Sequence, residues 1–183
     1  MKKLRVLALM HANLVPPDDV SGFDVTAVPW KMEFDVAETL RYMGHEVFQC
    51  GVEDDLGTIR KAIAEFKPHI VFNLLESFHG IGVFDSHVVG LLELLRVPYT
   101  GCNPRGLMLA RDKSLSKTLM TGHRIPVPDY LVVRMGRKAR RPKKLEFPLI
   151  VKSLTQESSI GISRASVVED EEKLRERVRF IHE

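Results

Sequence analysis

LRVLALM, residues 4–10, is the stretch that decides the fold class, because every residue in it except Arg5 is apolar. A strand that is apolar throughout is typical of a sheet covered on both faces. Two more runs, EVFQC at 46–50 and HIVFNL at 69–74, read as further strands. The segments between them repeat apolar residues at helical spacing, at Phe34, Ala37, Leu40 and Met43 and again at Leu56, Ile59, Ile63 and Phe66. Strands that alternate with amphipathic helices predict an α/β fold with a parallel sheet.

The predicted helices of this first part carry start and stop signals. Gly44 stands where a left-handed C-cap belongs, and Pro68 ends the second helix. Asp85 or Ser86 is expected to cap a third helix, and residues 97–100 predict a short further strand.

Parallel sheets bind ligands at the carboxyl ends of their strands. We therefore expect a ligand near the loops that follow Met10 and Leu74. No GxGxxG motif follows the first strand, which argues against a Rossmann-type dinucleotide site.

After Gly101 the sequence changes to shorter segments of mixed character. We expect a helix at 112–120, strands at 130–133, 147–152 and 163–168, and a last helix at 170–181. The sequence thus predicts two domains, a Rossmann-like parallel-sheet domain at 1–101 and a small α+β lobe at 102–183.

Positive charge is concentrated in one loop. Residues 134–144, RMGRKARRPKK, hold seven basic residues and no acid, and subtracting them from the net charge of +3 leaves −4 for the rest. A nucleic-acid-binding protein should not become acidic when one loop is set aside. A solvated basic loop is the simpler interpretation, and we expect no nucleic-acid partner.

The cysteines and the apolar runs indicate the cellular compartment of the protein. Cys50 and Cys102 lack the CxxC spacing of metal or redox sites, and two free thiols fit a reducing cytosol. The apolar run at 6–10 is too short for a signal peptide, and no segment approaches the roughly 20 apolar residues that span a bilayer. We expect a cytoplasmic protein without a membrane partner.

FPLIVKSLTQESSIG, residues 147–161, is the strongest candidate for chemistry. Lys152 ends an apolar strand, where a cation is expected to meet an anion or solvent. The polar segment after it, with Ser158, Ser159 and Gly161, has the hydroxyl and backbone N–H donors that surround a phosphate. A surface turn with a solvated lysine remains the alternative.

A second cation, Lys113, lies in LARDKSLSK at the start of a predicted helix. The helix dipole does not stabilise a lysine at the N-terminal end of a helix. Lys113 makes better sense if the helix start and the lysine together bind an external phosphate. Asp112 is explained as the N-cap in either case.

Two long stretches resemble a known family. They are LLELLRVPYTGCNPRGLMLARDKSLSKTLMTGHRIPVPDYLVV at 91–133 and FPLIVKSLTQESSIGISR at 147–164. Together they resemble the D-alanine–D-alanine ligases of the ATP-grasp superfamily, and the match extends over roughly residues 73–168. The resemblance implies a parallel-sheet pre-ATP-grasp domain followed by the first, small α+β lobe of the ATP-grasp domain.

The resemblance also implies roles for single residues. The lysine of the DK pair and the lysine that ends PLIVK contact ATP phosphates in this family, which points to Lys113 and Lys152. The loop with Ser158, Ser159 and Gly161 would close over the triphosphate. Ser158 would also approach the substrate, as would His79.

The implied activity is ATP-dependent joining of a small carboxylate to an amine through an acyl phosphate, with Mg²⁺ as cofactor. In the family, the hinge that binds adenine and the metal ligands follow the helix that matches 170–181. The resemblance therefore implies that this chain stops before the catalytic lobe and is inactive by itself. It also implies a homodimer formed through the first domain.

The substrate is left open because the family pattern is broken at its substrate loops. HGIGVFDSHVVG, residues 79–90, stands where the family has HGxxGEDGxxQG, so Phe84 and Val89 replace the Glu and the Gln. MHANLVPPDD replaces a Gly-rich turn with a Glu that recognises the first D-alanine. A D-alanine-specific pocket is therefore not expected. Two other interpretations stay open: a non-catalytic binding module on the same fold, and a nucleic-acid-binding protein that uses 134–144.

Overall fold

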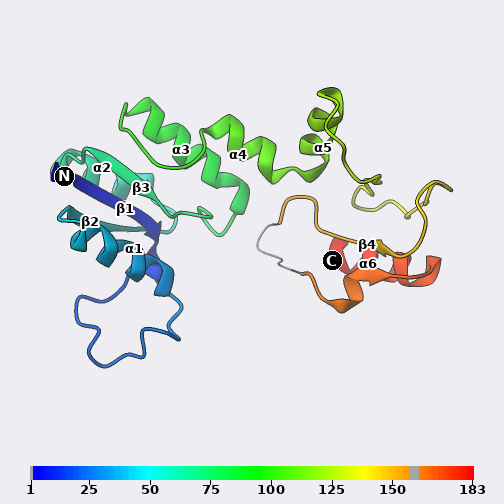
Figure 1. Cartoon of the computed structure of the whole chain (residues 1–183), viewed down its shortest axis with the longest axis horizontal. Helices are drawn as coiled ribbons and strands as arrows, with labels where there is room; N and C mark the ends of the chain where they lie inside the picture. The colour runs from blue at the N-terminus through cyan, green and yellow to red at the C-terminus, as the bar shows by residue number, and fades with distance from the viewer. Residues whose placement is uncertain (1, 157–160) are drawn as a thin grey trace. The chain divides into compact units, whose positions relative to one another are not determined.

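The computed structural model of the chain describes residues 2–156 and 161–183. It divides into two compact units, Met1–Leu107 and Met108–Glu183, each of which is described by itself (Figure 1). The sequence predicted the boundary between residues 101 and 102, and the units divide between residues 107 and 108.

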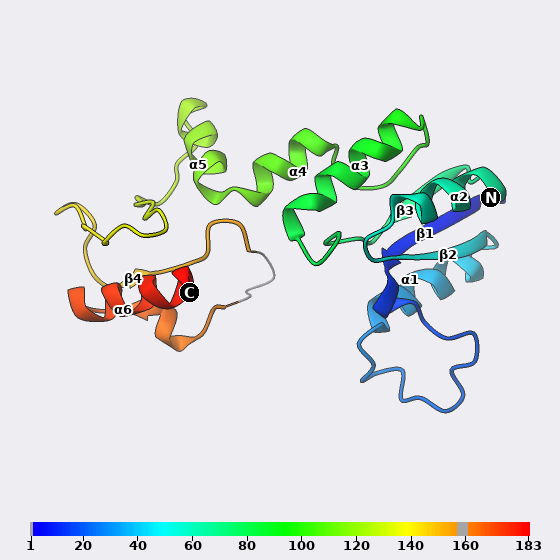
Figure 2. The same ribbon diagram turned by 180° about the vertical axis from the view of Figure 1, so that it is seen from behind.

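The first unit is built on a parallel sheet of β1 (Arg5–His11), β2 (Glu46–Val52) and β3 (Ile70–Asn73) in the order β2-β1-β3. The central strand β1 pairs with β2 along its whole length and with β3 from Val6 to Leu9. The strands run in one direction in both views (Figures 1 and 2). This arrangement confirms the parallel α/β sheet predicted from the apolar runs.

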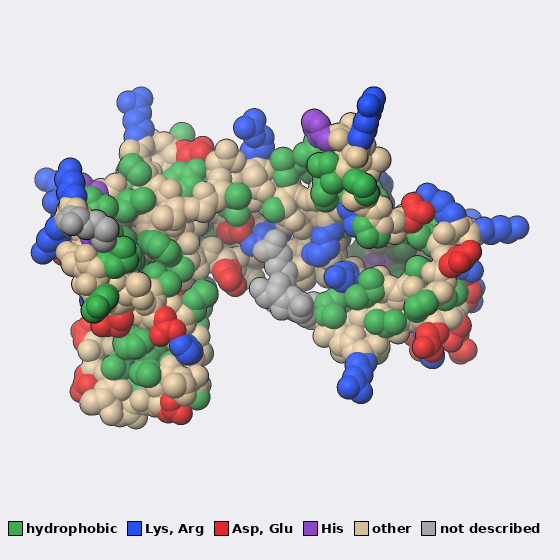
Figure 3. Space-filling view, in the orientation of Figure 1, with side chains coloured by type: hydrophobic (Ala, Val, Ile, Leu, Met, Phe, Trp, Pro, Cys, Tyr) green, Lys and Arg blue, Asp and Glu red, His purple; other side chains and the backbone are tan. Residues whose placement is uncertain are grey.

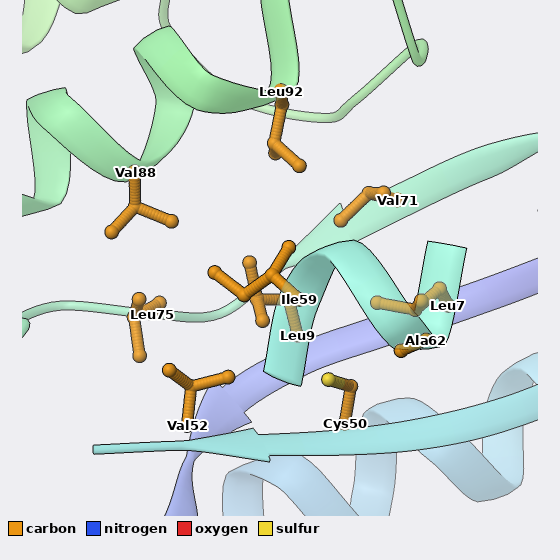
Figure 4. Close-up of a cluster of buried hydrophobic side chains, with 10 residues drawn as sticks. All are labelled: Leu7, Leu9, Cys50, Val52, Ile59, Ala62, Val71, Leu75, Val88 and Leu92. Atoms are coloured by element: carbon orange, nitrogen blue, oxygen red, sulfur yellow. The ribbon is translucent and has the colours of Figure 1, made fainter. Parts of the chain in front are cut away.

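Helices cover both faces of this sheet. α2 (Leu56–Phe66) and α3 (Asp85–Leu94) pack on one face, and α1 (Lys31–Tyr42) lies on the other (Figure 1). The buried cluster under α2 and α3 consists of Leu7, Leu9, Cys50, Val52, Ile59, Ala62, Val71, Leu75, Val88 and Leu92 (Figure 4). Successive side chains of a strand point to opposite faces, so Val6, Ala8 and Met10 are buried on the side of α1.

The predicted C-terminal ends of α1 and α2 are confirmed. Gly44 has a φ of 86° just past α1, a backbone conformation that glycine adopts without strain. The side chain of Asp55 caps α2 by accepting a hydrogen bond from Gly57 N at 2.7 Å. Lys67, with a φ of 49°, ends α2 directly before Pro68.

The predicted strand at 97–100 is wrong, because the segment forms only one parallel bridge, between Val71 and Tyr99. Thr100 N donates to Val71 O at 3.0 Å, but Asn73 N donates to the hydroxyl of Thr100 at 3.0 Å. The Thr100 hydroxyl thus accepts the bond that its backbone carbonyl would accept in a continued parallel ladder, and the strand pairing ends at this point.

The expected side-chain cap of α3 is also wrong. Its N-cap is Phe84, which makes no side-chain capping bond, and the Asp85 carboxylate accepts a hydrogen bond from Ser86 N at 2.5 Å from within the helix. Ser86 instead donates its hydroxyl to Val83 O at 3.0 Å, because a 3-10 turn at Gly82–Phe84 runs directly into the helix.

One helix was not predicted at all, α4 (Pro104–Arg111). Its start carries two recognisable signals. Asn103 accepts a hydrogen bond from Gly106 N at 2.8 Å, as an N-cap does, and Pro104 occupies the first helical position, which proline favours.

The second unit contains α5 (Lys113–Gly122), β4 (Leu149–Ile150), a 3-10 turn (Arg164–Ser166), β5 (Val167–Val168) and α6 (Glu171–His182). β4 and β5 pair antiparallel, and α6 packs its buried Leu174 and Val178 with Val168 and Ala139. Asp170 caps α6 by accepting from Lys173 N at 2.8 Å.

The strands of the second unit are shorter than predicted, and residues 130–133 form none. An isolated strand leaves its backbone N–H and C=O groups without partners. No described segment pairs with 130–133, and Leu131 and Val132 stay 42% and 39% exposed. The apolar run there therefore marks a partly covered loop.

Candidate functional site

Lys113 is the first residue of α5, as predicted, and Asp112 is its N-cap. The carboxylate of Asp112 accepts hydrogen bonds from Ser114 N and Leu115 N, each at 2.9 Å. Lys113 donates two hydrogen bonds to a segment about forty residues later in the chain. Its backbone N donates to Leu154 O at 3.3 Å, and its Nζ donates to Gln156 O at 2.6 Å. The start of α5 therefore lies against residues 154–156.

Lys152 lies at the end of the short antiparallel ladder. Val151 N donates to Ser166 O at 2.8 Å, which continues the pairing of β4 and β5 to the residue before the lysine. The side chain of Lys152 is exposed, and it makes no hydrogen bond or ion pair with any described residue. Lys152 lies two residues before Leu154, whose carbonyl accepts a hydrogen bond from Lys113.

The predicted phosphate loop is only partly described. Ser158 and Ser159 lie outside the described residues. Gly161, at the far end, has a φ of 71°, which favours glycine. Its carbonyl accepts a hydrogen bond from the guanidinium of Arg177, which also donates to Ser166 Oγ at 2.9 Å. Arg177 is only 8% exposed, so α6 holds the far end of the segment firmly.

His79, expected near the substrate, lies in an exposed loop of the first unit. Its backbone has a φ of 55°, and its N–H donates to Glu53 O at 2.6 Å. Its Nδ1 is 3.9 Å from a carboxylate oxygen of Asp54. Ser158 and His79 stay predicted substrate contacts.

A hollow of about 230 Å³ lies in the first unit at the carboxyl ends of β1 and β3, where the sheet predicts a ligand. Its walls come from His11 at the end of β1, Leu14 after it, Met32 and Glu33 of α1, and Glu76 and Ser77 after β3. Its lining is part polar and part apolar.

Glu33, at this hollow, is a functional candidate that the sequence reasoning missed. It is 1% exposed, and its Oε2 has no hydrogen-bond partner among the described residues. Burial raises the pKa of Glu33, its own backbone N–H works against that shift, and the charge of Glu76 raises the pKa further. Its spacing from Ala37, one helical turn later, was the available signal, because both residues face the sheet.

The basic loop at 134–144 is partly neutralised by the lobe itself. Arg141 pairs with Glu171 at 2.8 Å and lies over the ring of Phe147, and Lys144 pairs with Asp129 at 3.1 Å. Other basic side chains project into solvent over the second unit (Figure 3). The ion pairs fit the interpretation of a solvated surface loop.

The described residues contain no group of three or more His, Cys, Asp or Glu that would hold a metal ion. The resemblance places the Mg²⁺ ligands after the helix that matches 170–181, so these residues are not expected to hold that ion. Burial raises the pKa of Cys50 to about 11, which keeps its thiol protonated and unreactive. No helix in the described part of the chain is long and apolar enough to cross a membrane.

No family model matches the chain. Among curated proteins, the "Uncharacterized protein y4sG" of Sinorhizobium fredii is 33% identical over 164 residues, which cover 84% of this chain and 46% of that protein. The D-alanine–D-alanine ligase of Aquifex aeolicus is 32% identical over 141 residues, which cover 77% of this chain and 45% of the ligase. The chain thus spans less than half the length of these relatives.

Among solved structures, the D-alanine–D-alanine ligase from Bacillus anthracis complexed with ATP has a TM-score of 0.69 and 21% identity. The match covers 98% of this chain and 55% of that one. At 21% sequence identity, this structural similarity shows the fold alone. Together with the curated ligases, it confirms that the chain resembles ATP-grasp D-alanine–D-alanine ligases over part of their length.

Proposed function

We propose that this chain, a relative of the D-alanine–D-alanine ligases, is the N-terminal, phosphate-binding part of an ATP-dependent carboxylate–amine ligase. One observation carries the proposal: Lys113 at the start of α5 holds the backbone of residues 154–156, directly beyond Lys152, which has no partner among the described residues. Two lysines and a helix start that share one polar segment supply the positive charge that a triphosphate requires.

In the proposed reaction, a carboxylate oxygen attacks the γ-phosphorus of ATP, and the bond from that phosphorus to the β–γ bridging oxygen breaks. The products of this step are an acyl phosphate and ADP. An amine nitrogen then attacks the acyl carbon, phosphate leaves, and a C–N bond forms. Phosphoryl transfer depends chiefly on positioning and on charge neutralisation.

The chain's own residues have separate parts in this reaction. Lys152 and Lys113 neutralise the phosphate oxygens, and the segment with Ser158, Ser159 and Gly161 closes over them. The bond from Lys113 Nζ to Gln156 O fixes the near end of that segment. Arg177 fixes its far end through Gly161 O. His79 and Ser158 are proposed to contact the substrates.

Mg²⁺, when bound, neutralises further phosphate charge through oxygen ligands. We assign its ligands to sequence beyond residue 183 of a longer protein. We therefore expect the 183-residue chain alone to form no ligated product. Product formation from ATP and a panel of carboxylates and amines by the purified chain would overturn this part of the proposal.

Lys152→Ala in a longer protein that contains this chain should weaken ATP binding at least tenfold, because it removes a cation that we assign to the phosphates. Lys143→Ala is the matched control, since Lys143 is also an exposed lysine of the second unit and should leave ATP affinity unchanged. Calorimetric titration with ATP measures both. Equal ATP affinity and turnover in Lys152→Ala and the wild type would remove the phosphate assignment.

The remaining partner assignments are also proposals. The two free cysteines support a cytoplasmic location. We propose small carboxylate and amine substrates, a homodimer formed through the first unit, and no nucleic-acid or membrane partner.

A further inference from the structure

The basic loop at 134–144 forms part of a second hollow, of about 240 Å³, which the proposed reaction does not use. Four of the seven basic residues of the loop line it: Arg134, Arg137, Lys138 and Arg140. No acidic side chain lines this basic hollow in the part of the chain that the structure describes. Four positive charges around one hollow repel each other, and a bound anion would reduce that repulsion.

The loop divides its charge between the lobe and the basic hollow. Arg141 and Lys144 form ion pairs with Glu171 and Asp129. The four cations of the basic hollow make no ion pair or side-chain hydrogen bond with any residue among 2–156 and 161–183. Lys143, the seventh basic residue, is exposed and does not line the hollow. The charges at the hollow are therefore distinct from those that the lobe neutralises.

Local structure brings the four cations together. Arg137 N donates to Arg134 O at 2.9 Å, which closes a turn, and Gly136 in this turn has a φ of 75°. A β-turn with a positive φ at its third residue favours glycine there. Ala139, which separates the other two cations, is 7% exposed and belongs to the core of the second unit. A closed turn and a buried alanine thus position the backbone that carries the cations.

The apolar residues of the basic hollow distinguish an organic anion from an inorganic one. Leu131 and Val132 line the hollow and remain 42% and 39% exposed. Val133 also lines it, and its carbonyl oxygen lies 3.2 Å from His182 Nε2 of α6. An organic group bound against these residues would remove apolar surface from water, which is favourable. The hollow therefore offers both charge and apolar contact.

The cations favour a phosphate over a carboxylate. Arginine binds phosphate oxygens through paired hydrogen bonds. A phosphate monoester concentrates a charge of about −1.5 to −2 on one group at pH 7, so a single phosphate faces several cations at once. A carboxylate brings only one negative charge.

We propose that the basic hollow binds a small phosphate monoester with an apolar organic part. It would be a second anion site of this unit, separate from Lys113 and Lys152, and its existence does not depend on the proposed ligase reaction.

A nucleic acid fits this site less well. Nucleic-acid-binding proteins present a positive groove that follows the phosphate backbone over several nucleotides. Here the positive charge is confined to one loop, because the charge of +3 becomes −4 when residues 134–144 are set aside. The volume of about 240 Å³ suits a small molecule.

The test titrates the 183-residue chain with phenyl phosphate, with inorganic phosphate as its charged counterpart and benzyl alcohol as its apolar counterpart. NMR follows the backbone amide signals of residues 131–140. Phenyl phosphate should shift these signals in a saturable manner. Inorganic phosphate should bind at least about fivefold more weakly, because it lacks the apolar contact. Benzyl alcohol should cause no saturable shift.

Lys138→Gln should lower phenyl phosphate affinity about fivefold, because it removes one charge at the hollow. Lys143→Gln is the matched control, since it is the same substitution at an exposed lysine of the same loop that does not line the hollow. It should retain wild-type affinity. Arg140→Lys keeps the charge but loses the paired hydrogen bonds, so it should also weaken binding. Circular dichroism verifies that each variant is folded.

Three outcomes would overturn the inference. Equal losses in Lys138→Gln and Lys143→Gln would show a response to net charge alone. Equal affinities for phenyl phosphate and inorganic phosphate would show that the apolar residues take no part. An oligothymidylate that binds more tightly than phenyl phosphate and weakens equally in both variants would assign the loop to a nucleic acid.

Failure of this inference is distinguishable from failure of the proposed function. Phenyl phosphate shifts confined to Lys113 and residues 152–156 would refute the basic hollow and leave the proposed phosphate site standing. Saturable shifts at residues 131–140, combined with unchanged ATP affinity in Lys152→Ala of the longer protein, would do the reverse.

Discussion

Glu33 is the residue whose protonation should affect stability most clearly. Burial, and then the charge of Glu76, raise the pKa of its carboxyl in the folded chain. Between the ordinary carboxyl pKa of about 4.3 and this higher folded value, the folded chain binds more protons than the unfolded chain. The free energy of unfolding contributed by Glu33 is therefore present at lower pH and lost as the pH rises through that window.

Glu33→Gln should remove this loss. We expect the variant to be more stable than the wild type at pH 7 and equally stable near pH 4. Urea unfolding at both pH values measures the difference. Glu38→Gln should show no such pH-dependent gain, and a gain of equal size there would contradict the assignment to Glu33.

At the same scale, Lys113 and Lys152 were predicted as phosphate contacts, and their roles stay predictions. Their positions at a helix start and beyond a strand end agree with the sequence pattern. Glu33 was not found, because a charged residue on a helix is ordinarily exposed. Only the packing of α1 on the sheet buries it.

At the scale of single elements, α5 depends on its N-cap. Asp112 accepts two backbone hydrogen bonds there, so Asp112→Ala should lower the free energy of unfolding of the second unit by about 1 kcal/mol. Asp112→Asn, which keeps a side-chain oxygen that accepts these bonds, should lower the free energy of unfolding much less. Chemical denaturation of both variants measures this. Equal losses in the two variants would show that the side-chain oxygen is not the cause.

Elements with local signals were predicted well. An apolar run sufficed for β1, and Pro68 marked the end of α2. Residues 130–133 have the same apolar character as a strand but find no partner. A strand forms only when its backbone pairs with another strand, which lies elsewhere in the sequence, so an apolar run alone does not predict it. The helix α4 differs, because its capping residue and its proline were local signals that the prediction missed.

At the scale of the whole molecule, the chain has two separate cores. The first unit holds ten buried cluster residues between its sheet, α2 and α3. The second unit holds a smaller cluster around Val168, Leu174 and Val178. A small core contributes less hydrophobic free energy, so we expect the second unit to unfold at lower urea concentration.

Hydrogen exchange in increasing urea, read separately for β1 and α6, tests this expectation. Val178→Ala should lower the midpoint for α6, by a free energy of about 2 kcal/mol, and leave β1 unchanged. Val71→Ala should do the reverse. A common midpoint that shifts equally in both variants would show that the chain unfolds as one body.

The sequence by itself determined the parallel α/β class, most helix ends and the identity of the lysines expected at phosphate, because these follow from local periodicity, caps and motif spacing. Tertiary structure alone decided that Lys113 holds residues 154–156, that 130–133 remains a loop, and that Glu33 is buried at a hollow. Each of these depends on contacts between residues far apart in the chain. The helical spacing of Glu33 and Ala37 places them on one face, but only the packing of α1 on the sheet buries that face.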